Sequence, residues 1–169
     1  MSLNLSSNTK YNIQNKMTFI ADACTCSSGF KNFNVGTKNT CLLLLQAGDK
    51  GPNDILTRIY KSHSYCKARN SELPLPTNAI ENENYRLAMI SLGGIKAAAL
   101  DLNDINQEGK YVKFSNGKSP SWFSWKPGEP NNSYGNEDYI ALLLDPSPEN
   151  WNDYNKNERV SIICEKKCL

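Results

Sequence analysis

Side chains that carry oxygen gather in one stretch of the sequence, residues 125–139, which reads WKPGEPNNSYGNEDY. Carboxylate and amide oxygens are ligands that Ca²⁺ prefers, and the ion takes about six to eight of them. Glu129, Asn131 and Glu137 supply part of such a shell, and the WND segment at 151–153 supplies more if the chain returns beside the loop. The alternative interpretation is a solvated surface loop, because Gly, Pro, Asn and Ser are ordinary loop residues.

The composition is that of one globular domain. The chain has 169 residues, of which 39% are hydrophobic and 21% charged, enough for one core but not for two full domains. Residues 1–22 are mostly polar without a regular period, so we expect a flexible N-terminal arm followed by a domain over residues 23–169. The net charge of +2 is scattered, which argues against nucleic acid or a membrane surface as partner, and we expect no membrane span.

The cysteines form an even set, which in a domain of this size indicates three disulfides in an oxidising compartment. The six are Cys24, Cys26, Cys41, Cys66, Cys164 and Cys168. A metal thiolate site is the alternative, but the Cys-x-Cys spacing does not suit zinc and the one histidine, His63, stands outside any metal-like pattern. We therefore expect a secreted, extracellular protein, and the polar start without a signal-peptide pattern indicates a mature or an engineered N-terminus.

Two helices are expected in the first half of the domain. A short apolar strand at 40–47 precedes a cap at Asn53 or Asp54, after which apolar and aromatic residues recur at helical spacing as far as Cys66. The second helix follows Pro76 and Asn78 and stops at two glycines. Its expected apolar side consists of Ile80, Leu87 and Ile90.

The second half of the chain has the pattern of strands. We expect them at 97–102, 110–114, 121–125, 139–144 and 159–165, with an Asn-Gly hairpin turn between the second and the third. Two helices followed by such strands predict an α+β fold with a mostly antiparallel sheet.

The order of these motifs resembles that of C-type lectin-like domains over about residues 24–165. Cys66 is followed by the proline and the Glu-Asn pair of the second helix, and Cys164 lies in the last strand. Between them stand PGEPNN, YGNEDY and NWNDY, in the order of that family. The resemblance implies a C-type lectin-like fold with a long calcium-binding loop and a cis peptide bond between Glu129 and Pro130.

The resemblance also implies a principal calcium site that binds sugar. Its matching residues are Glu129, Asn131, Glu137, Asn152 and Asp153. Two neighbouring sugar hydroxyls would join the ion, donating to carboxylates and accepting from asparagine amides. The order Glu-Pro-Asn goes with mannose-type sugars, namely mannose, N-acetylglucosamine, glucose or fucose, as glycan partners. Weak single sites of this kind need several copies for avidity, so a homo-oligomer is expected.

An auxiliary calcium site is implied less completely. Its matching residues are Asp104, Glu108, Asn132, Glu137 and Asp138. Asn132 stands where an acid is common in the family, and the lower charge predicts weaker Ca²⁺ binding.

The family's cysteine pattern is only partly present. The positions of its second internal disulfide are Tyr139 and Lys156, so no covalent bond ties the long loop to the WND segment. The resemblance pairs Cys66 with Cys164. It pairs either Cys24 or Cys26 with Cys41, and the one of these two that remains would then join Cys168.

The same residues also allow other interpretations. Trp122, Trp125 and Trp151 could stack on sugars, but aromatics of this kind more often belong to the core. Catalysis is not expected, because acids that share Ca²⁺ stay ionised whereas a glycosidase needs a protonated acid, and no nucleophile motif is present. The serious rival is a calcium-stabilised protein-binding or structural module of the same fold.

Overall fold

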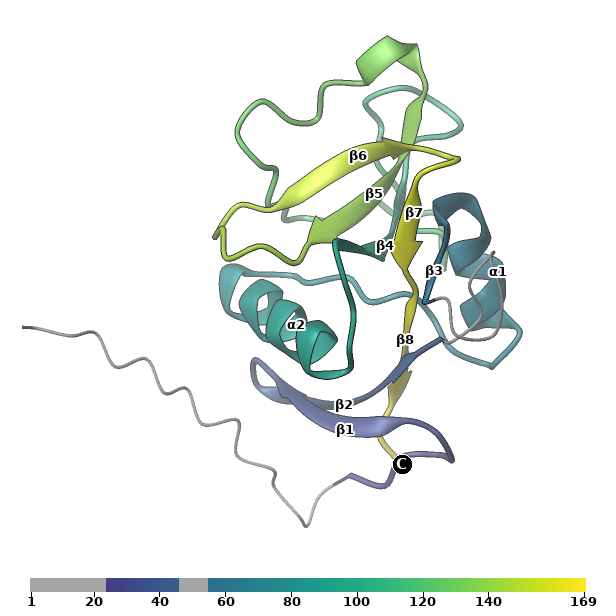
Figure 1. The fold of residues 1–169 in the computed structure, drawn as a ribbon, viewed down its shortest axis with the longest axis vertical. Coiled ribbons are helices and arrows are strands. Elements are labelled where there is room, and N and C mark those ends of the chain that lie inside the picture. Colours follow the sequence, from purple (N-terminus) through teal and green to yellow (C-terminus); the bar gives the residue numbers. More distant parts are fainter. Residues whose placement is uncertain (1–23, 46–54) are drawn as a thin grey trace, which may run out of the picture.

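The computed structural model describes residues 24–45 and 55–169, and these residues form two helices and two sheets (Figure 1). The expected arm at 1–22 and the expected cap at Asn53 or Asp54 lie outside the described residues. In chain order the elements are β1 (Lys31–Val35), β2 (Lys38–Leu44), β3 (Leu56–Arg58), the 3₁₀ turn η1 (Ile59–Lys61), α1 (Ser62–Lys67), α2 (Ala79–Ser91), β4 (Ala97–Asn103), the 3₁₀ turn η2 (Ser133–Gly135), β5 (Glu137–Leu143), β6 (Trp151–Asn155), β7 (Arg159–Ser161) and β8 (Ile163–Lys167).

The strands form a five-stranded sheet and a three-stranded sheet within the described part of the chain. The strand order is β3-β7-β4-β5-β6 in the larger sheet and β1-β2-β8 in the smaller one. Neighbouring strands are antiparallel except β4 and β7, which are parallel. The α+β class with a mostly antiparallel sheet is therefore confirmed.

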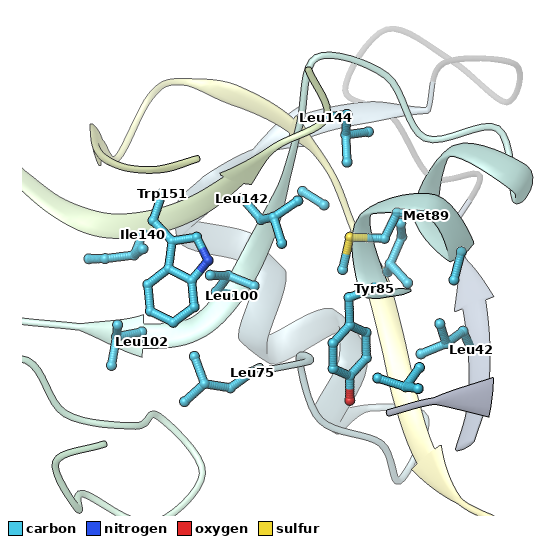
Figure 2. Close-up of a cluster of buried hydrophobic side chains, with 14 of the residues drawn as sticks. Leu42, Leu75, Tyr85, Met89, Leu100, Leu102, Ile140, Leu142, Leu144 and Trp151 are labelled. Atoms are coloured by element: carbon cyan, nitrogen blue, oxygen red, sulfur yellow. The ribbon is translucent and has the colours of Figure 1, made fainter. Parts of the chain in front are cut away.

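The two sheets lie at opposite ends of the molecule, with α2 against the smaller one (Figure 1). The long loop before β5 projects beyond the larger sheet (Figure 1). Tyr85 and Met89 of α2 face Leu42 of β2 and extend into a cluster with Leu142 (Figure 2). Burying such side chains is worth about 1.5–3 kcal/mol each, so this cluster holds the two sheets in a fixed relation.

Trp151 links α2 to the start of β6. Its side chain is fully buried, and its indole Nε1 donates to Oδ1 of Asn82 in α2 at 2.8 Å. The amide of Asn82 donates in turn to Oδ1 of buried Asn150 at 2.9 Å. Trp122 and Trp125 are partly buried and pack on the same cluster, so the expected core role holds for all three tryptophans. This network fixes the place where the WND segment begins.

The first helix is shorter than the sequence predicts. Residues 56–58 form β3, which pairs with β7, and α1 begins only at Ser62. Pairing with a distant strand satisfies the backbone hydrogen bonds of this segment and overrides the local helical spacing. His63 lies in α1 and stacks on Phe114 at a ring distance of 5.0 Å.

The second helix begins as predicted, but its expected apolar side is wrong. Oδ1 of Asn78 caps the helix by accepting the N–H of Glu81 at 2.9 Å. Ile80 is 69% exposed and Ile90 is 42% exposed, whereas Tyr85 is buried. The buried face includes polar residues whose hydrogen bonds are satisfied, such as Glu81 and Asn82, and apolar spacing alone does not reveal such a face.

Two of the expected strands are absent from the described residues. Segment 110–114 contributes a single bridge between Val112 and Asn103, and segment 121–125 contributes one between Trp125 and Trp151. The Asn-Gly turn between them does form, with Gly117 at φ 68. The aromatic side chains of 121–125 pack around Trp151 instead of lining a ladder.

The expected strand at 159–165 is split in two. It becomes β7 and β8, which join different sheets, whereas the strands expected at 97–102 and 139–144 are present as β4 and β5. The strand expected at 40–47 is present as β2, which ends at Leu44.

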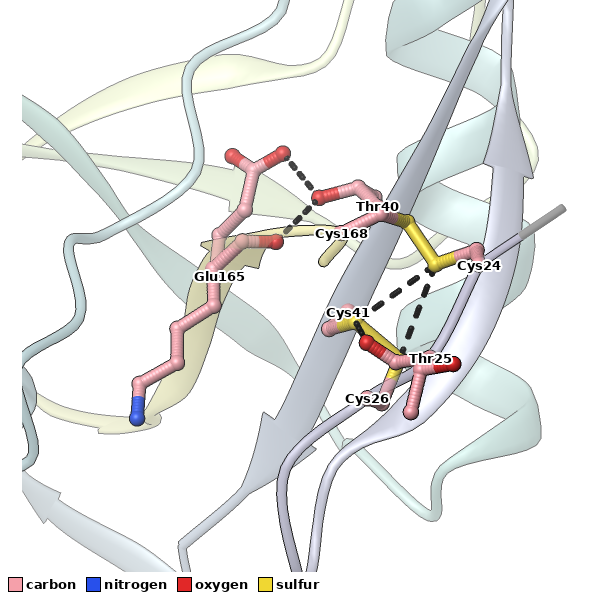
Figure 3. Close-up of a disulfide and its surroundings, with 8 residues drawn as sticks. Cys24, Thr25, Cys26, Thr40, Cys41, Glu165 and Cys168 are labelled. Atoms are coloured by element: carbon pink, nitrogen blue, oxygen red, sulfur yellow. Dashed lines mark hydrogen bonds between the residues drawn. A yellow bond between two sulfur atoms is a disulfide. The ribbon is translucent and has the colours of Figure 1, made fainter.

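Three disulfides are present. They join Cys66 to Cys164, Cys26 to Cys41 and Cys24 to Cys168. The structure thereby assigns Cys26 as the partner of Cys41, a choice that the sequence left open. The sulfur of Cys24 lies 3.7 Å from that of Cys41 (Figure 3), but all three neighbouring cysteines are oxidised and offer no thiolate for a metal.

Candidate calcium and sugar site

The candidate site lies where the long loop meets the hairpin of β5 and β6. The N–H of Lys126 donates to the carbonyl of Trp151 at 2.9 Å, so the loop departs beside the start of β6. The loop returns into β5, whose residues Ile140 and Ala141 are in register with Asp153 and Asn152. The WND segment therefore returns beside the loop, as the predicted calcium site requires.

Asp153 is the buried centre of this arrangement. Its side chain is fully buried, and its two carboxylate oxygens accept the backbone N–H groups of Asn131 at 3.3 Å and Asn132 at 2.8 Å. The peptide bond between Glu129 and Pro130 is cis. Asp153 therefore fixes the loop next to the Glu-Pro-Asn motif.

The two glutamates of the site stand close to other acids. Burial raises the pKa of the Glu129 carboxyl, and contact with Asp153 and the charge of Glu137 raise it further. Burial also raises the pKa of Glu137, against the opposing effect of the Ser133 N–H, which donates to its carboxylate at 2.7 Å. Carboxylates this close destabilise one another unless a cation or a proton balances them.

Two oxygens in this cluster lack a partner within the described chain. Oε2 of Glu129 and Oδ1 of Asn152 are buried and accept no hydrogen bond there. Buried polar atoms are normally satisfied, so such atoms need an explanation. Unpaired carboxylate and amide oxygens beside further acids fit a hard cation such as Ca²⁺, and we conclude that the residues suit the ion that the sequence predicts.

Asn131 is exposed, and only its backbone N–H has a contact with the cluster among the described residues. Of the five predicted ligands, Glu129 contacts Asp153 and lies near the charge of Glu137. Asn152 precedes Asp153 in β6, and both pair with residues of β5. Tyr134, at the crest of the loop, is 99% exposed and has a φ of 59°. No motif in the sequence points to this residue, and its only signal is an aromatic side chain among amides and glycine.

The auxiliary residues lie in a neighbouring group. Asp104 is 1% exposed, one carboxylate oxygen accepts the N–H of Gly109 at 2.8 Å, and the other has no partner in the described chain. Burial raises the pKa of Asp104, and the charges of Glu108 and Asp138 add to the effect. Its N–H donates to the carbonyl of Asp138 at 3.2 Å, which joins the two segments.

Asn132 is engaged on both sides of its amide. The NH₂ group donates to the carboxylate of Glu108, and Oδ1 accepts the N–H of Glu137 at 3.0 Å. An acid at this position would offer free oxygens to an ion, whereas this amide crosslinks the loop. The auxiliary group therefore offers fewer free ligands than the principal one.

Packing replaces the absent disulfide at the base of the loop. Tyr139 is in register with Tyr154, and its ring stacks near Phe114 at 6.1 Å. Lys156 is exposed in the turn after β6. The loop base is thus held by strand pairing and aromatic contacts without a covalent bond.

The lectin C-type domain model matches residues 56–166, and the chain belongs to this family. Its members are binding domains and not enzymes, in agreement with the sequence analysis. Among the described residues, no helix is long and apolar enough to cross a membrane.

The chain is similar to several curated proteins. It is 29% identical to collectin-10 of Gallus gallus over 147 residues, which is 81% of this chain and 52% of that protein. It is 35% identical to collectin-43 of Bos taurus over 100 residues, 59% of this chain and 30% of that protein. Perlucin of Haliotis laevigata is 30% identical over 103 residues, covering 61% and 66% respectively. The chain thus spans about half or less of the length of these collectins.

Solved structures share the fold at low identity. The C-type lectin CEL-I from Cucumaria echinata has a TM-score of 0.67 and 18% identity, covering 83% of this chain and 96% of that one. A calcium-independent type II antifreeze protein has the same TM-score with 12% identity, covering 88% and 99%. These likenesses establish the fold alone, and function has to be argued from the site.

Proposed function

We propose that residues 23–169 form a calcium-dependent carbohydrate-recognition domain. Ca²⁺ would be held by Glu129, Asn131, Glu137, Asn152 and Asp153. The observation that carries the proposal is the pair of buried oxygens, Oε2 of Glu129 and Oδ1 of Asn152, that have no partner in the described chain beside the buried carboxylate of Asp153. Asp104, Glu108 and Asp138, with Asn132 and Glu137, are proposed as a weaker second cation site.

The side chains of the site divide into acceptors and donors. When bound, Ca²⁺ supplies a positive centre that takes neighbouring sugar hydroxyls as ligands. The carboxylates of Glu129 and Glu137 accept hydrogen bonds from such hydroxyls, whereas the amide NH₂ groups of Asn131 and Asn152 donate to them. Asp153 keeps the loop in place through the two backbone N–H groups that it accepts.

The proposed sugar class is mannose-type, meaning mannose, N-acetylglucosamine, glucose or fucose. The order of acceptor and donor in Glu129-Pro130-Asn131 supports it, because this order matches hydroxyls that are both equatorial. The site lies on an open loop at one end of the molecule (Figure 1), where terminal residues of a glycan can reach it. Three disulfides support secretion, and weak single sites favour a homo-oligomer that gains avidity.

Calcium titration tests this proposal directly. Isothermal titration should detect at least one Ca²⁺ site in the wild-type protein, and Asn152→Ala should weaken it by about tenfold, because one neutral ligand is lost. Asn157→Ala, an exposed amide in the adjoining turn, is the matched control and should bind Ca²⁺ normally. Wild-type heats that equal those of buffer would overturn the proposal.

Sugar binding separates a lectin from a structural module of the same fold. In the presence of Ca²⁺, mannose should elute the wild-type protein from a mannan column, and galactose should not. Chelator should elute it as well. Calcium binding without retention on any glycan would favour the protein-binding or structural alternative.

A further inference from the structure

A cleft apart from the candidate calcium site is lined by residues of α1, the start of β2, the end of β8 and the segment at Phe114 and Ser115. Its volume is about 890 Å³, which is within the range of roughly 300–1,000 Å³ typical of small-ligand sites. None of the predicted calcium ligands lines it. Any ligand of this cleft would therefore bind without the proposed calcium site.

Lysine ammonium groups give the cleft cations that are not neutralised. Lys38, Lys67, Lys166 and Lys167 line it, and the ammonium of Lys166 lies over the ring of Phe30, 4.8 Å from its centroid. Lys38 pairs with Glu165 at 3.6 Å, whereas Lys67 and Lys167 make no ion pair within residues 24–45 and 55–169. Both unpaired lysines are exposed, so their charge is available to a ligand. An anionic group is the natural partner of two such ammonium ions.

Carboxylates in the same cleft restrict what that anion can be. Glu165 accepts the hydroxyls of Thr40 at 2.6 Å and Tyr85 at 2.5 Å through Oε1, and Figure 3 shows Thr40 directed at this carboxylate from β2. Its Oε2 and the exposed carboxylate of Glu72 remain as acceptors. A purely anionic ligand would be repelled by these acids, whereas a ligand that also carries hydroxyl donors would satisfy them.

A flat aromatic wall completes the cleft. The rings of His63 and Phe114 are stacked at 5.0 Å with an interplanar angle of 17°, and both are half-buried. The amides of Asn39 and Asn70 also line the cleft and provide neutral donors and acceptors. The C–H face of a sugar ring packs well on such a surface, because aromatic rings present a large apolar area.

We propose that this cleft is a calcium-independent binding site for an acidic saccharide. Its sulfate or carboxylate group lies near Lys67 and Lys167, and its hydroxyls bind Glu72 and Glu165. A ligand with negative charge, several hydroxyls and an apolar ring face matches all three features of the cleft. A phosphate ion or an acidic peptide matches only the lysines.

The proposal is tested by titration in chelator, which disables the proposed calcium site. The probes are a sulfated tetrasaccharide from heparin, a carboxylated tetrasaccharide from hyaluronan, and neutral chitotetraose. One of the two acidic probes should bind to the wild-type protein, and its affinity should fall as salt is raised, because exposed charges are screened. Chitotetraose should bind at least about tenfold more weakly, since it offers no charge to the lysines.

Substitutions locate the binding in the cleft. Lys67→Gln and Lys167→Gln should each weaken the acidic probe by roughly fivefold to tenfold, and the Lys67→Arg variant should retain it. Lys96→Gln, which removes the same charge from an exposed position outside the cleft, is the matched control and should leave affinity unchanged. A thermal unfolding transition in chelator that matches the wild-type transition would show that all these variants are folded.

Three outcomes would overturn the proposal. These are the absence of binding by either acidic probe in chelator, equal loss of affinity in Lys96→Gln and Lys67→Gln, and equally tight binding of a tetraglutamate peptide. The first would place all glycan binding elsewhere, the second would indicate a general charge effect, and the third would show that the cleft selects charge alone. Failure of mannan binding would bear on the proposed calcium site only, because this titration contains no free calcium.

Discussion

Asp153 shows how one residue organises the candidate site. Its carboxylate is buried without a basic partner among the interactions that the structure gives it, and it holds the backbone of Asn131 and Asn132. Glu129 and Asn152 keep oxygens free beside it. The acidic and amide side chains thus have two different roles. A carboxylate that accepts backbone N–H groups fixes the loop, whereas unpaired oxygens are available to a cation.

Exchange of the two residues around Pro130 should change the sugar preference. The double variant Glu129→Gln with Asn131→Asp exchanges a pure acceptor and a donor, so galactose should elute it from an immobilised-galactose column in Ca²⁺ and mannose should elute it poorly. The matched control, Glu149→Gln with Asn116→Asp, makes the same chemical exchange at exposed positions outside the loop. Unchanged mannose preference in the double variant would contradict the role given to this motif.

At the scale of elements, the hairpin of β5 and β6 provides the rigid base and three of the five proposed ligands, and the long loop provides the other two, Glu129 and Asn131. Strand pairing holds Asn152 and Asp153 in register with β5, whereas the loop is attached through hydrogen bonds to Asp153, Glu137 and Glu108. Tyr139 and Lys156 stand where the resemblance to the family implies a disulfide, and neither can form one. The loop should therefore be the part of the domain that responds most to calcium.

Hydrogen exchange should reveal this response. With chelator, residues 127–138 should exchange faster than with Ca²⁺, because the carboxylates of Glu129, Glu137 and Asp153 then repel one another. The strands β1 and β2 should exchange equally in both conditions. Asn152→Ala should reduce the difference at matched calcium concentration. Equal protection of the loop with and without calcium in the wild-type protein would show that packing alone orders it.

At the scale of the whole molecule, the Cys24–Cys168 disulfide and the candidate site lie at opposite ends (Figure 1). Cys24–Cys168 joins residues 144 positions apart, and backbone bonds between Thr25 and Leu169 at 3.4 Å and 3.3 Å accompany it. These contacts attach the C-terminal end to the entry of the domain. The long loop is remote from them in Figure 1. Loss of the disulfide should therefore lower the stability of the fold without changing ligand binding.

Removal of this disulfide tests the separation. Cys24→Ser with Cys168→Ser should lower the free energy of unfolding by about 2–5 kcal/mol, since a long closed loop regains entropy in the unfolded chain. Chemical denaturation in chelator measures the loss against the wild-type protein. Calcium affinity by titration at a temperature where both proteins are folded should stay within about twofold. A calcium affinity reduced tenfold or more would show that the two ends are coupled.

The sequence by itself determined the types and order of the site residues, the even set of cysteines, the α+β class and the cap at Asn78. These features are local, since a motif, a cap or a cysteine can be recognised from neighbouring residues. Only the tertiary structure decided that residues 56–58 pair as a strand, that Ile80 faces solvent, that Cys26 pairs with Cys41, and that Lys67 and Lys167 share a cleft with Glu165. Each of these depends on which distant segments meet, and pairing and burial between distant segments leave no local period in the sequence.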